Sequence, residues 1–144
     1  MPQHGALDPD ELLYRRISLK ANPPQISSND RAVLQAAFLP HKLRDTDGLT
    51  VIRAKYRNAK EVACPPKSSH RDYVVAVVRA GDLMELGLTL EVTPDEIDID
   101  LGGTPAHVSI REMNADAYRD DNVYSWARQI AEHHVLEILG PFPL

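Results

Sequence analysis

The chain has 144 residues, of which 43% are hydrophobic and 26% are charged, and its formal net charge at pH 7 is −5. These values suit a soluble globular protein that is large enough to bury a core without disulfides or metals. The single cysteine, Cys64, excludes an internal disulfide and favours a reducing compartment. No apolar run approaches the roughly 20 residues that span a bilayer, and the first residues lack the features of a signal peptide. We therefore expect a cytoplasmic protein without membrane association.

The charges are divided unevenly along the chain. Residues 1–72 carry 12 Lys and Arg against 8 Asp and Glu, a balance of +4, whereas residues 73–144 carry 4 against 13, a balance of −9. Such asymmetry can indicate a surface for nucleic acid or for an acidic protein partner. Because the basic residues are interleaved with acids, the favoured interpretation is that two oppositely charged faces of one domain attract each other.

The N-terminal part of the chain predicts an arm, a strand and a loop. Residues 1–10 lack periodicity and are expected to form a loose arm. Residues 12–17 predict a strand with Arg15 and Arg16 on opposite faces. Because both arginines cannot lie in a core, we expect this strand at an edge of the sheet or partly exposed. The Pro-, Ser- and Asn-containing stretch 18–31 predicts a long loop.

The following segment predicts two short helices around a strand. Residues 33–38 can form a helix that ends before Pro40. A turn at 45–48 precedes the strand 49–54, and residues 57–63 can form another short helix that two prolines end.

Residues 73–111 are the most apolar and β-branched part of the chain and are expected to form the centre of the core. Strands are predicted over 73–79, 88–92 and 105–111. A single helical turn that ends at Gly87 joins the first two of these strands.

The acidic stretch before the last of these strands allows two interpretations. Asp95 and Glu96 can open a short helix, whereas the alternation of Ile97, Ile99 and Leu101 with acids is typical of a strand. Strict alternation favours a strand at an edge of the sheet, with its acidic face in water.

The C-terminal region has the clearest periodicity in the chain. Its apolar positions recur at the i, i+3, i+4, i+7 spacing of a helix over four turns. These positions are Val123, Trp126, Ala127, Ile130, Ala131, His134, Val135, Ile138 and Leu139. One of Asp120, Asp121 and Asn122 is expected to cap this helix, and Gly140 followed by Pro141 is expected to end it.

These elements predict an α+β fold in one domain, residues 1–144. About five strands would form a mainly antiparallel or mixed sheet, and one long C-terminal helix would pack across it. Burial of that helix should dominate the stability of the C-terminal third.

Three groups of short motifs follow one another within about residues 12–110. They are Leu13-Tyr14-Arg15-Arg16-Ile17, then Ala36-Ala37-Phe38 ahead of Asp47-Gly48-Leu49-Thr50-Val51, then Leu86-Gly87-Leu88 ahead of Pro105-Ala106-His107-Val108. In this order they resemble a widespread group of small bacterial proteins to which no activity is assigned. That group has two serines directly before Ala-Ala-Phe, whereas Val33-Leu34-Gln35 precedes it here. The resemblance implies a bacterial, single-domain accessory protein and supplies no activity.

The six histidines suggest a metal site, but their spacing argues against one. His133 and His134 are adjacent, so their rings would point about 100° apart on a helix and would not chelate one ion easily. His133, Glu137 and His107 could together hold an ion, although a solvated helix face explains the first two better. We expect no metal and no cofactor.

A nucleophile would need Ser109 or Cys64 beside His107 or His70 and a carboxylate. His107 and Ser109 lie two residues apart and would share one face of a strand. No nucleophile-elbow motif accompanies them, so the sequence identifies no catalytic residue.

A basic group flanked by tyrosines is the most interesting candidate binding site. Arginines on two strands that can be adjacent would form a surface suited to phosphate or single-stranded nucleic acid. With His107, the candidate binding residues are Tyr14, Arg15, Arg16, Arg53, Lys55, Tyr56 and Arg57. The alternative is a set of solvated edge residues that pair with the acids of the second half, which the acidic overall charge favours.

Three functional hypotheses follow from the sequence. The first is a non-catalytic binding or accessory module that acts within a larger bacterial protein complex. The second is a small enzyme or toxin-like protein that acts on a nucleotide or nucleic acid through Arg15, Arg53 and His107. The third is a homodimer without another partner.

Overall fold

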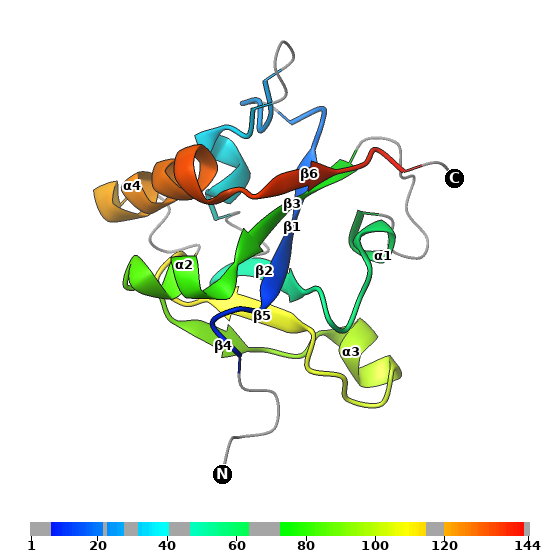
Figure 1. Cartoon of the computed structure of the whole chain (residues 1–144). Helices are drawn as coiled ribbons and strands as arrows, with labels where there is room; N and C mark the ends of the chain where they lie inside the picture. Colours follow the sequence, from blue (N-terminus) through cyan, green and yellow to red (C-terminus); the bar gives the residue numbers. More distant parts are fainter. Residues whose placement is uncertain are drawn as a thin grey trace.

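The computed structural model describes residues 7–21, 23–27, 32–40, 47–63, 73–114 and 120–142. Within these residues, six strands form one sheet in the order β4-β5-β2-β1-β3-β6 (Figure 1). The strands are β1 (Leu12–Ser18), β2 (Leu49–Arg53), β3 (Tyr73–Arg79), β4 (Leu90–Val92), β5 (His107–Ile110) and β6 (Glu137–Leu139). Every neighbouring pair is antiparallel, which confirms the predicted α+β class and a mainly antiparallel sheet.

The helical elements lie on both sides of this sheet (Figure 1). They are the 3₁₀ helix η1 (Gln35–Phe38), α1 (Ala59–Ala63), α2 (Ala80–Glu85), α3 (Glu96–Asp100), α4 (Asp121–Gln129) and the π-helical turn η3 (Ile130–His134). Among the helices of the described ranges, none is long and apolar enough to cross a membrane.

The main core lies between one face of the sheet and the helices η1, α2 and α4. Its members from the sheet are alternate residues of the strands, as the period of a pleated strand requires. They include Leu13, Ile17, Val51, Val74, Ala76, Val78, Val108 and Ile110. We call this the first face of the sheet. Helix α1 covers part of the second face, where Ala59 and Ala63 pack against Val75.

Strand β1 is central in the sheet and partly exposed, so of the two predicted alternatives the edge position is wrong and the partial exposure is confirmed. It pairs with β3 over seven residues, from Leu12↔Arg79 to Ser18↔Tyr73, and with β2 on its other side. The two arginines are tolerated in a central strand because the guanidinium group of each interacts with neighbouring groups. The Arg15 guanidinium donates to two backbone carbonyls, and Arg16 lies over an aromatic ring.

Residues 7–11, which include the end of the predicted arm, contact helix α2. Leu7 packs against the main core, and the amides of Ala80 and Gly81 donate to the carbonyls of Glu11 and Pro9. Residues 1–6 lie outside the described residues.

The acidic stretch after β4 forms helix α3 rather than the predicted edge strand. Asp95 caps this helix: its side chain accepts from the Asp98 amide at 2.8 Å, and the Asp98 side chain accepts from the Asp95 amide at 3.2 Å. This capping box satisfies backbone donors locally and outweighs the alternating pattern. Two residues that the alternation would have buried, Ile99 and Leu101, are exposed.

The C-terminal helix ends at His134, five residues before the predicted end. Its first turns follow the prediction, since Asp120 caps α4 and Val123, Ala127 and Ile130 are buried. Residues 137–139 then leave the helical path and pair with β3 as strand β6. The ladder satisfies the backbone groups along the outer side of β3, which a helix over these residues would have left open.

Candidate binding groove

A groove of about 680 Å³ lies on the second face of the sheet, beside the line along which β1 and β2 meet. We call it the β1–β2 groove. Its lining residues come from β1, β2, β3, β5, α1, α3, η1 and the connecting loops beside them. They are Tyr14, Arg15, Arg16, Ser18, Ala21, Pro23, Gln25, Ala36, Leu39, Pro40, Thr50, Ile52, Arg57, Glu61, Val62, Tyr73, Asp95, Ile97 and His107. Its volume falls within the range of small-molecule pockets.

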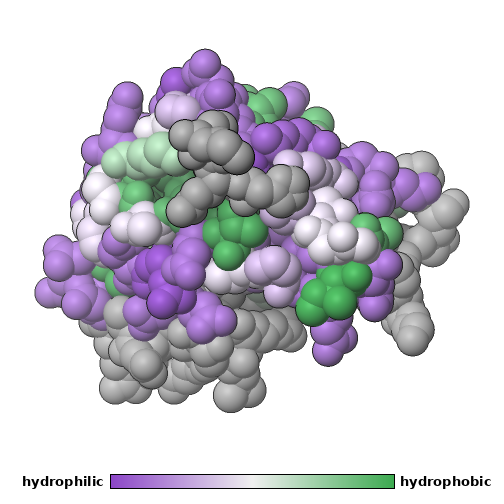
Figure 2. Space-filling view, turned by 90° about the horizontal axis from the view of Figure 1, so that it is seen from below, coloured by the Kyte–Doolittle hydropathy of each residue, from purple (hydrophilic) through white to green (hydrophobic). Residues whose placement is uncertain are grey.

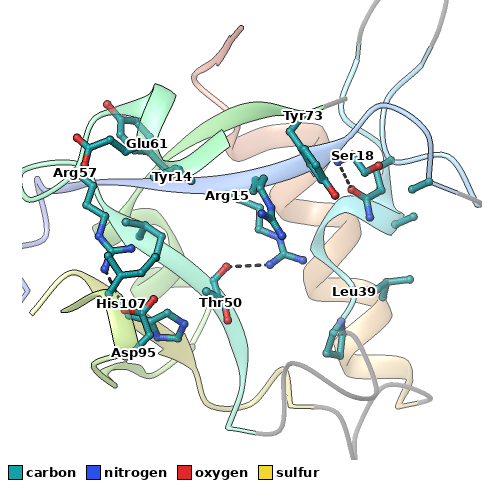
Figure 3. Close-up of a pocket in the computed structure, with 18 of the residues that line it drawn as sticks. Tyr14, Arg15, Ser18, Leu39, Thr50, Arg57, Glu61, Tyr73, Asp95 and His107 are labelled. Atoms are coloured by element: carbon teal, nitrogen blue, oxygen red, sulfur yellow. Dashed lines mark hydrogen bonds and ion pairs between the residues drawn. The ribbon is translucent and has the colours of Figure 1, made fainter. Parts of the chain in front are cut away.

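The groove exists because β1 and β2 pair only briefly. Their register contains the pairs Leu13↔Arg53 and Tyr14↔Ile52, after which the strands separate. The Arg15 side chain enters this separation and donates to the Thr50 carbonyl at 3.0 Å and to the Ala37 carbonyl at 2.9 Å. Figure 3 shows Arg15 in the middle of the groove, directed at Thr50. A guanidinium thus replaces ladder hydrogen bonds at the centre of the sheet.

One end of the groove is built around Arg57, which is buried. Its Nη2 donates to Asp95 Oδ1 at 3.0 Å and to Asp98 Oδ1. Asp98 is fully buried, and its other oxygen accepts from the His107 amide at 2.9 Å. Helix α3 therefore fixes the Arg57 guanidinium in one orientation, because both of its acidic partners belong to the α3 capping box.

Arg57 has one polar atom that this arrangement does not satisfy. Its Nε is buried and has no hydrogen-bond partner among the described residues. A buried donor without a partner costs roughly 1–3 kcal/mol, so such atoms are rare in folded proteins. The side chain that carries this N–H group lines the groove.

The acid beside Arg57 is held in its charged form. Partial burial alone would raise the pKa of the Asp95 carboxyl, but hydrogen bonds from the Asp98 amide and Arg57 outweigh it. Together with the charges of Arg57 and His107, they bring the pKa below its ordinary value. Asp95 is therefore a fixed anion that partly neutralises this end of the groove.

His107 also lies at this end, on the second face of β5. Its Nδ1 lies 3.0 Å from Thr93 Oγ1, and that hydroxyl lies 2.7 Å from Ser109 Oγ. Ser109 is buried. The contact that the sequence suggested between His107 and Ser109 is therefore indirect, through Thr93, and the serine hydroxyl is enclosed within the sheet surface.

The opposite end of the groove carries Tyr73, which pairs with Ser18 at the end of β1 (Figure 3), and Arg16 lies against it. The Arg16 guanidinium carbon lies 4.6 Å from the centre of the Tyr73 ring, a cation–π contact that restricts the side chain. The loop after β1 is fastened here, because the Ser18 amide donates to Gln25 Oε1 at 2.9 Å.

The structure divides the eight predicted binding residues into two groups. Five of them line the groove: Tyr14, Arg15, Arg16, Arg57 and His107. The remaining three, Arg53, Lys55 and Tyr56, gather around Glu11 and the turn after β2.

Arg53 is fully buried and cannot meet a ligand from solvent. Its Nη2 donates to Glu11 Oε2 at 3.0 Å, its Nε donates to Glu11 Oε1, and its Nη1 donates to the Pro105 carbonyl at 3.1 Å. Its guanidinium also lies 5.0 Å from the Tyr56 ring. This arginine joins the start of β1 to the segment before β5.

Sequence reasoning missed several residues that shape the groove, notably Tyr73, Asp95 and Asp98. The spacing of Asp95 and Asp98 is the signal that was available, because two acids three residues apart at a helix start are typical of a capping box. Nothing local indicated that these acids would meet Arg57, which is 38 residues away from Asp95 and 41 from Asp98.

Within the described ranges, no group of three His, Cys, Asp or Glu side chains is placed to hold an ion. His4, His41, His70 and Cys64 lie outside those ranges.

Figure 2 views the molecule from below, relative to Figure 1. On this face the hydrophobic residues form small, separate patches among hydrophilic ones.

No protein-family model, curated protein or solved structure matches the chain. The chemistry of the groove is therefore the basis for proposing a function.

Proposed function

We propose that this protein is a non-catalytic binding module that acts as an accessory part of a larger bacterial protein complex. In this proposal the β1–β2 groove receives part of the partner protein. The groove is preorganised, because Arg15, Arg57 and Asp98 are held by hydrogen bonds within the fold. Rigid polar groups reduce the entropy that binding must overcome.

The unpartnered Nε of Arg57 carries this proposal. The guanidinium is buried and is oriented by two acids, so it cannot turn to water without breaking those hydrogen bonds. Such an arrangement costs stability in the free protein. A ligand that accepts this hydrogen bond recovers the cost, as expected of a site that evolved to bind.

The groove offers less support for catalysis. A general acid or base needs access to substrate, and a nucleophile needs an exposed oxygen or sulfur beside a base. Ser109 is enclosed, and Asp98 is engaged by Arg57 and by the His107 amide. These groups act as supports for the fold in our proposal.

The second candidate is a small enzyme or toxin-like protein that acts on a nucleotide or nucleic acid. Its support is the presence of Arg15, Arg16 and His107 in one groove, with Tyr73 available for stacking. Burial of Arg53 removes one of the three groups on which that hypothesis relied.

The test is affinity purification of the tagged full-length protein from its own host at low and high salt. We expect a stoichiometric protein partner. Bound nucleotide or nucleic acid, detected by ultraviolet absorbance, would instead support the second candidate. A protein that is alone, or a homodimer by light scattering, at both salt concentrations would contradict the proposed function.

A further inference from the structure

Resting on the proposed function, we infer that the β1–β2 groove recognises an extended acidic segment of the partner protein. In this assignment Arg16 binds a carboxylate of that segment, and the Nε–H group of Arg57 donates to a neutral carbonyl oxygen of its backbone. The two ends of the groove differ in charge, and this difference defines the ligand.

The Arg57 end is unsuited to an anion. One guanidinium there faces two carboxylates, Asp95 and Asp98, and Glu61 lines the groove nearby. An incoming phosphate or carboxylate would be repelled by these acids. A neutral carbonyl oxygen accepts the Arg57 N–H without that repulsion, and every peptide unit provides one.

The Arg16 end is suited to an anion. No carboxylate of the described residues lies within ion-pair distance of Arg16, which instead rests on the Tyr73 ring. The neighbouring Arg15 also lines the groove, where it donates to the carbonyls of Ala37 and Thr50. A carboxylate here gains a charge-assisted hydrogen bond.

The distance between the two ends favours an extended peptide. Tyr14 lies near the Arg57 end and Ser18 lies at the Tyr73 end of the same strand (Figure 3). Four strand residues correspond to about 13 Å. A peptide of comparable extended length can reach both ends, while Leu39, Pro40 and Val62 provide apolar walls for its aliphatic side chains.

A nucleic-acid strand fits this groove less well. Its phosphates repeat along the whole backbone and require a continuous basic track. The β1–β2 groove instead has carboxylates at one end, from Glu61 and Asp95, and the chain has a net charge of −5.

The experiment selects short random peptides from a display library on the immobilised full-length protein and measures the binding of the selected peptides by fluorescence anisotropy. A single-stranded oligonucleotide serves as the second probe. We expect the selected peptides to share an Asp or Glu and to bind Arg16→Gln roughly tenfold more weakly than the wild type. Arg128→Gln is the matched control, because it removes an exposed arginine of α4 outside the groove, and it should bind normally.

A double-mutant cycle makes the assignment specific. Replacing the shared Asp or Glu of the peptide by its amide should weaken the binding of the peptide to the wild type. The same replacement should cause little further loss of affinity for Arg16→Gln. In addition, Arg57→Lys removes the Nε–H group and keeps the charge. This change should weaken the binding of the acidic peptide and of its amidated form to the same extent. Because Arg57 is buried, its effect is interpreted only for protein whose circular dichroism matches the wild type, and the Arg16 cycle decides the inference independently.

The outcomes separate the inference from the proposed function. Selected peptides without a common acid, equal losses in Arg16→Gln and Arg128→Gln, or oligonucleotide binding that depends on Arg16 would overturn the inference. If the host partner is nevertheless captured by Arg16→Gln as by the wild type, the accessory function survives and its contact lies elsewhere.

Discussion

Asp98 shows how much of this fold depends on single polar residues. It is fully buried, and its carboxylate accepts from Arg57 Nη2 and from the amides of His107 and Asp95. One side chain therefore joins α3, β5 and the turn after β2. Removing its charge would leave the buried Arg57 guanidinium with Asp95 as its only remaining acidic partner in the described structure.

We expect Asp98→Asn to lower the free energy of unfolding by roughly 3 kcal/mol, because breaking a buried ion pair leaves a charge without its partner. Denaturant unfolding measures this change. Asp100→Asn, an exposed acid of the same helix, should change stability by less than about 0.5 kcal/mol. Equal losses in the two variants would show that the charge of α3, and not the buried pair, is what matters.

The lowered pKa of Asp95 links stability to pH. Its pKa is lower in the folded than in the unfolded protein, so the folded state binds fewer protons as the pH falls through this range. The stability that Asp95 contributes is present above the unfolded pKa of about 3.9 and is lost as the pH falls through the folded pKa.

Asp95→Asn should therefore make unfolding free energy less dependent on pH between about pH 5 and pH 2, while asparagine still caps α3. Denaturant titrations across this range measure the slope. Glu112, whose pKa is lowered against partial burial by two hydrogen bonds from Thr89 at 2.7 Å each, contributes separately. Adding Glu112→Gln to Asp95→Asn should reduce the dependence of the unfolding free energy on pH further. If Asp95→Asn leaves this dependence unchanged, the lowered pKa of Asp95 does not contribute to stability.

At the scale of elements, the entry into β2 depends on a glycine. Gly48 has a φ of +141°, and a Cβ atom there would lie 2.3 Å from the carbonyl oxygen of Ile110, in the adjacent strand β5. Leu49, the next residue, pairs directly with Ile110. The backbone of β5 cannot move aside without breaking this register.

We expect Gly48→Ala to destabilise the protein by roughly 3 kcal/mol, because it combines a strained backbone with a steric clash. Gly102→Ala is the matched control: Gly102 also has a positive φ, +87°, but a Cβ atom there meets nothing within 4 Å. Its cost should be about 1–2 kcal/mol, from the backbone conformation alone. Thermal or denaturant unfolding of both variants distinguishes the two effects, and equal costs would contradict the clash.

The elements that sequence predicted correctly are those whose signals are local. Strands β2, β3 and β5 have the expected apolar and β-branched runs, and Asp120 caps α4 as predicted. The errors at α3 and β6 have different causes. A capping box outweighed alternation in α3, and β6 was assigned to the helix because residues 137–139 also fit its apolar spacing.

At the scale of the molecule, the order of the strands mixes distant parts of the chain. Strand β1 lies between β2 and β3, and the C-terminal strand β6 pairs with β3. The oppositely charged halves of the sequence are also joined, since Arg57 pairs with Asp95 and Asp98, and Asp10 with Arg79. Such interleaving predicts that neither half is stable without the other.

We therefore expect the full chain to unfold in one cooperative step, as the single-domain prediction requires. The only tryptophan, Trp126, lies in α4 and reports on the C-terminal helix, whereas far-ultraviolet circular dichroism reports on the whole fold. The two denaturant midpoints should coincide. An earlier fluorescence transition would show that α4 unfolds as a separate unit.

The sequence by itself determined the α+β class, the positions of most elements and the basic, tyrosine-flanked group near β1 and β2. These properties depend on local periodicity, capping and charge, which neighbouring residues specify. Tertiary structure alone decided that β1 is central, that residues 137–139 complete the sheet, and that Arg53 is buried whereas Arg16 faces a groove. Pairing and burial depend on residues that are distant in the chain, such as Glu11 for Arg53 and Asp98 for Arg57, and no local pattern encodes them.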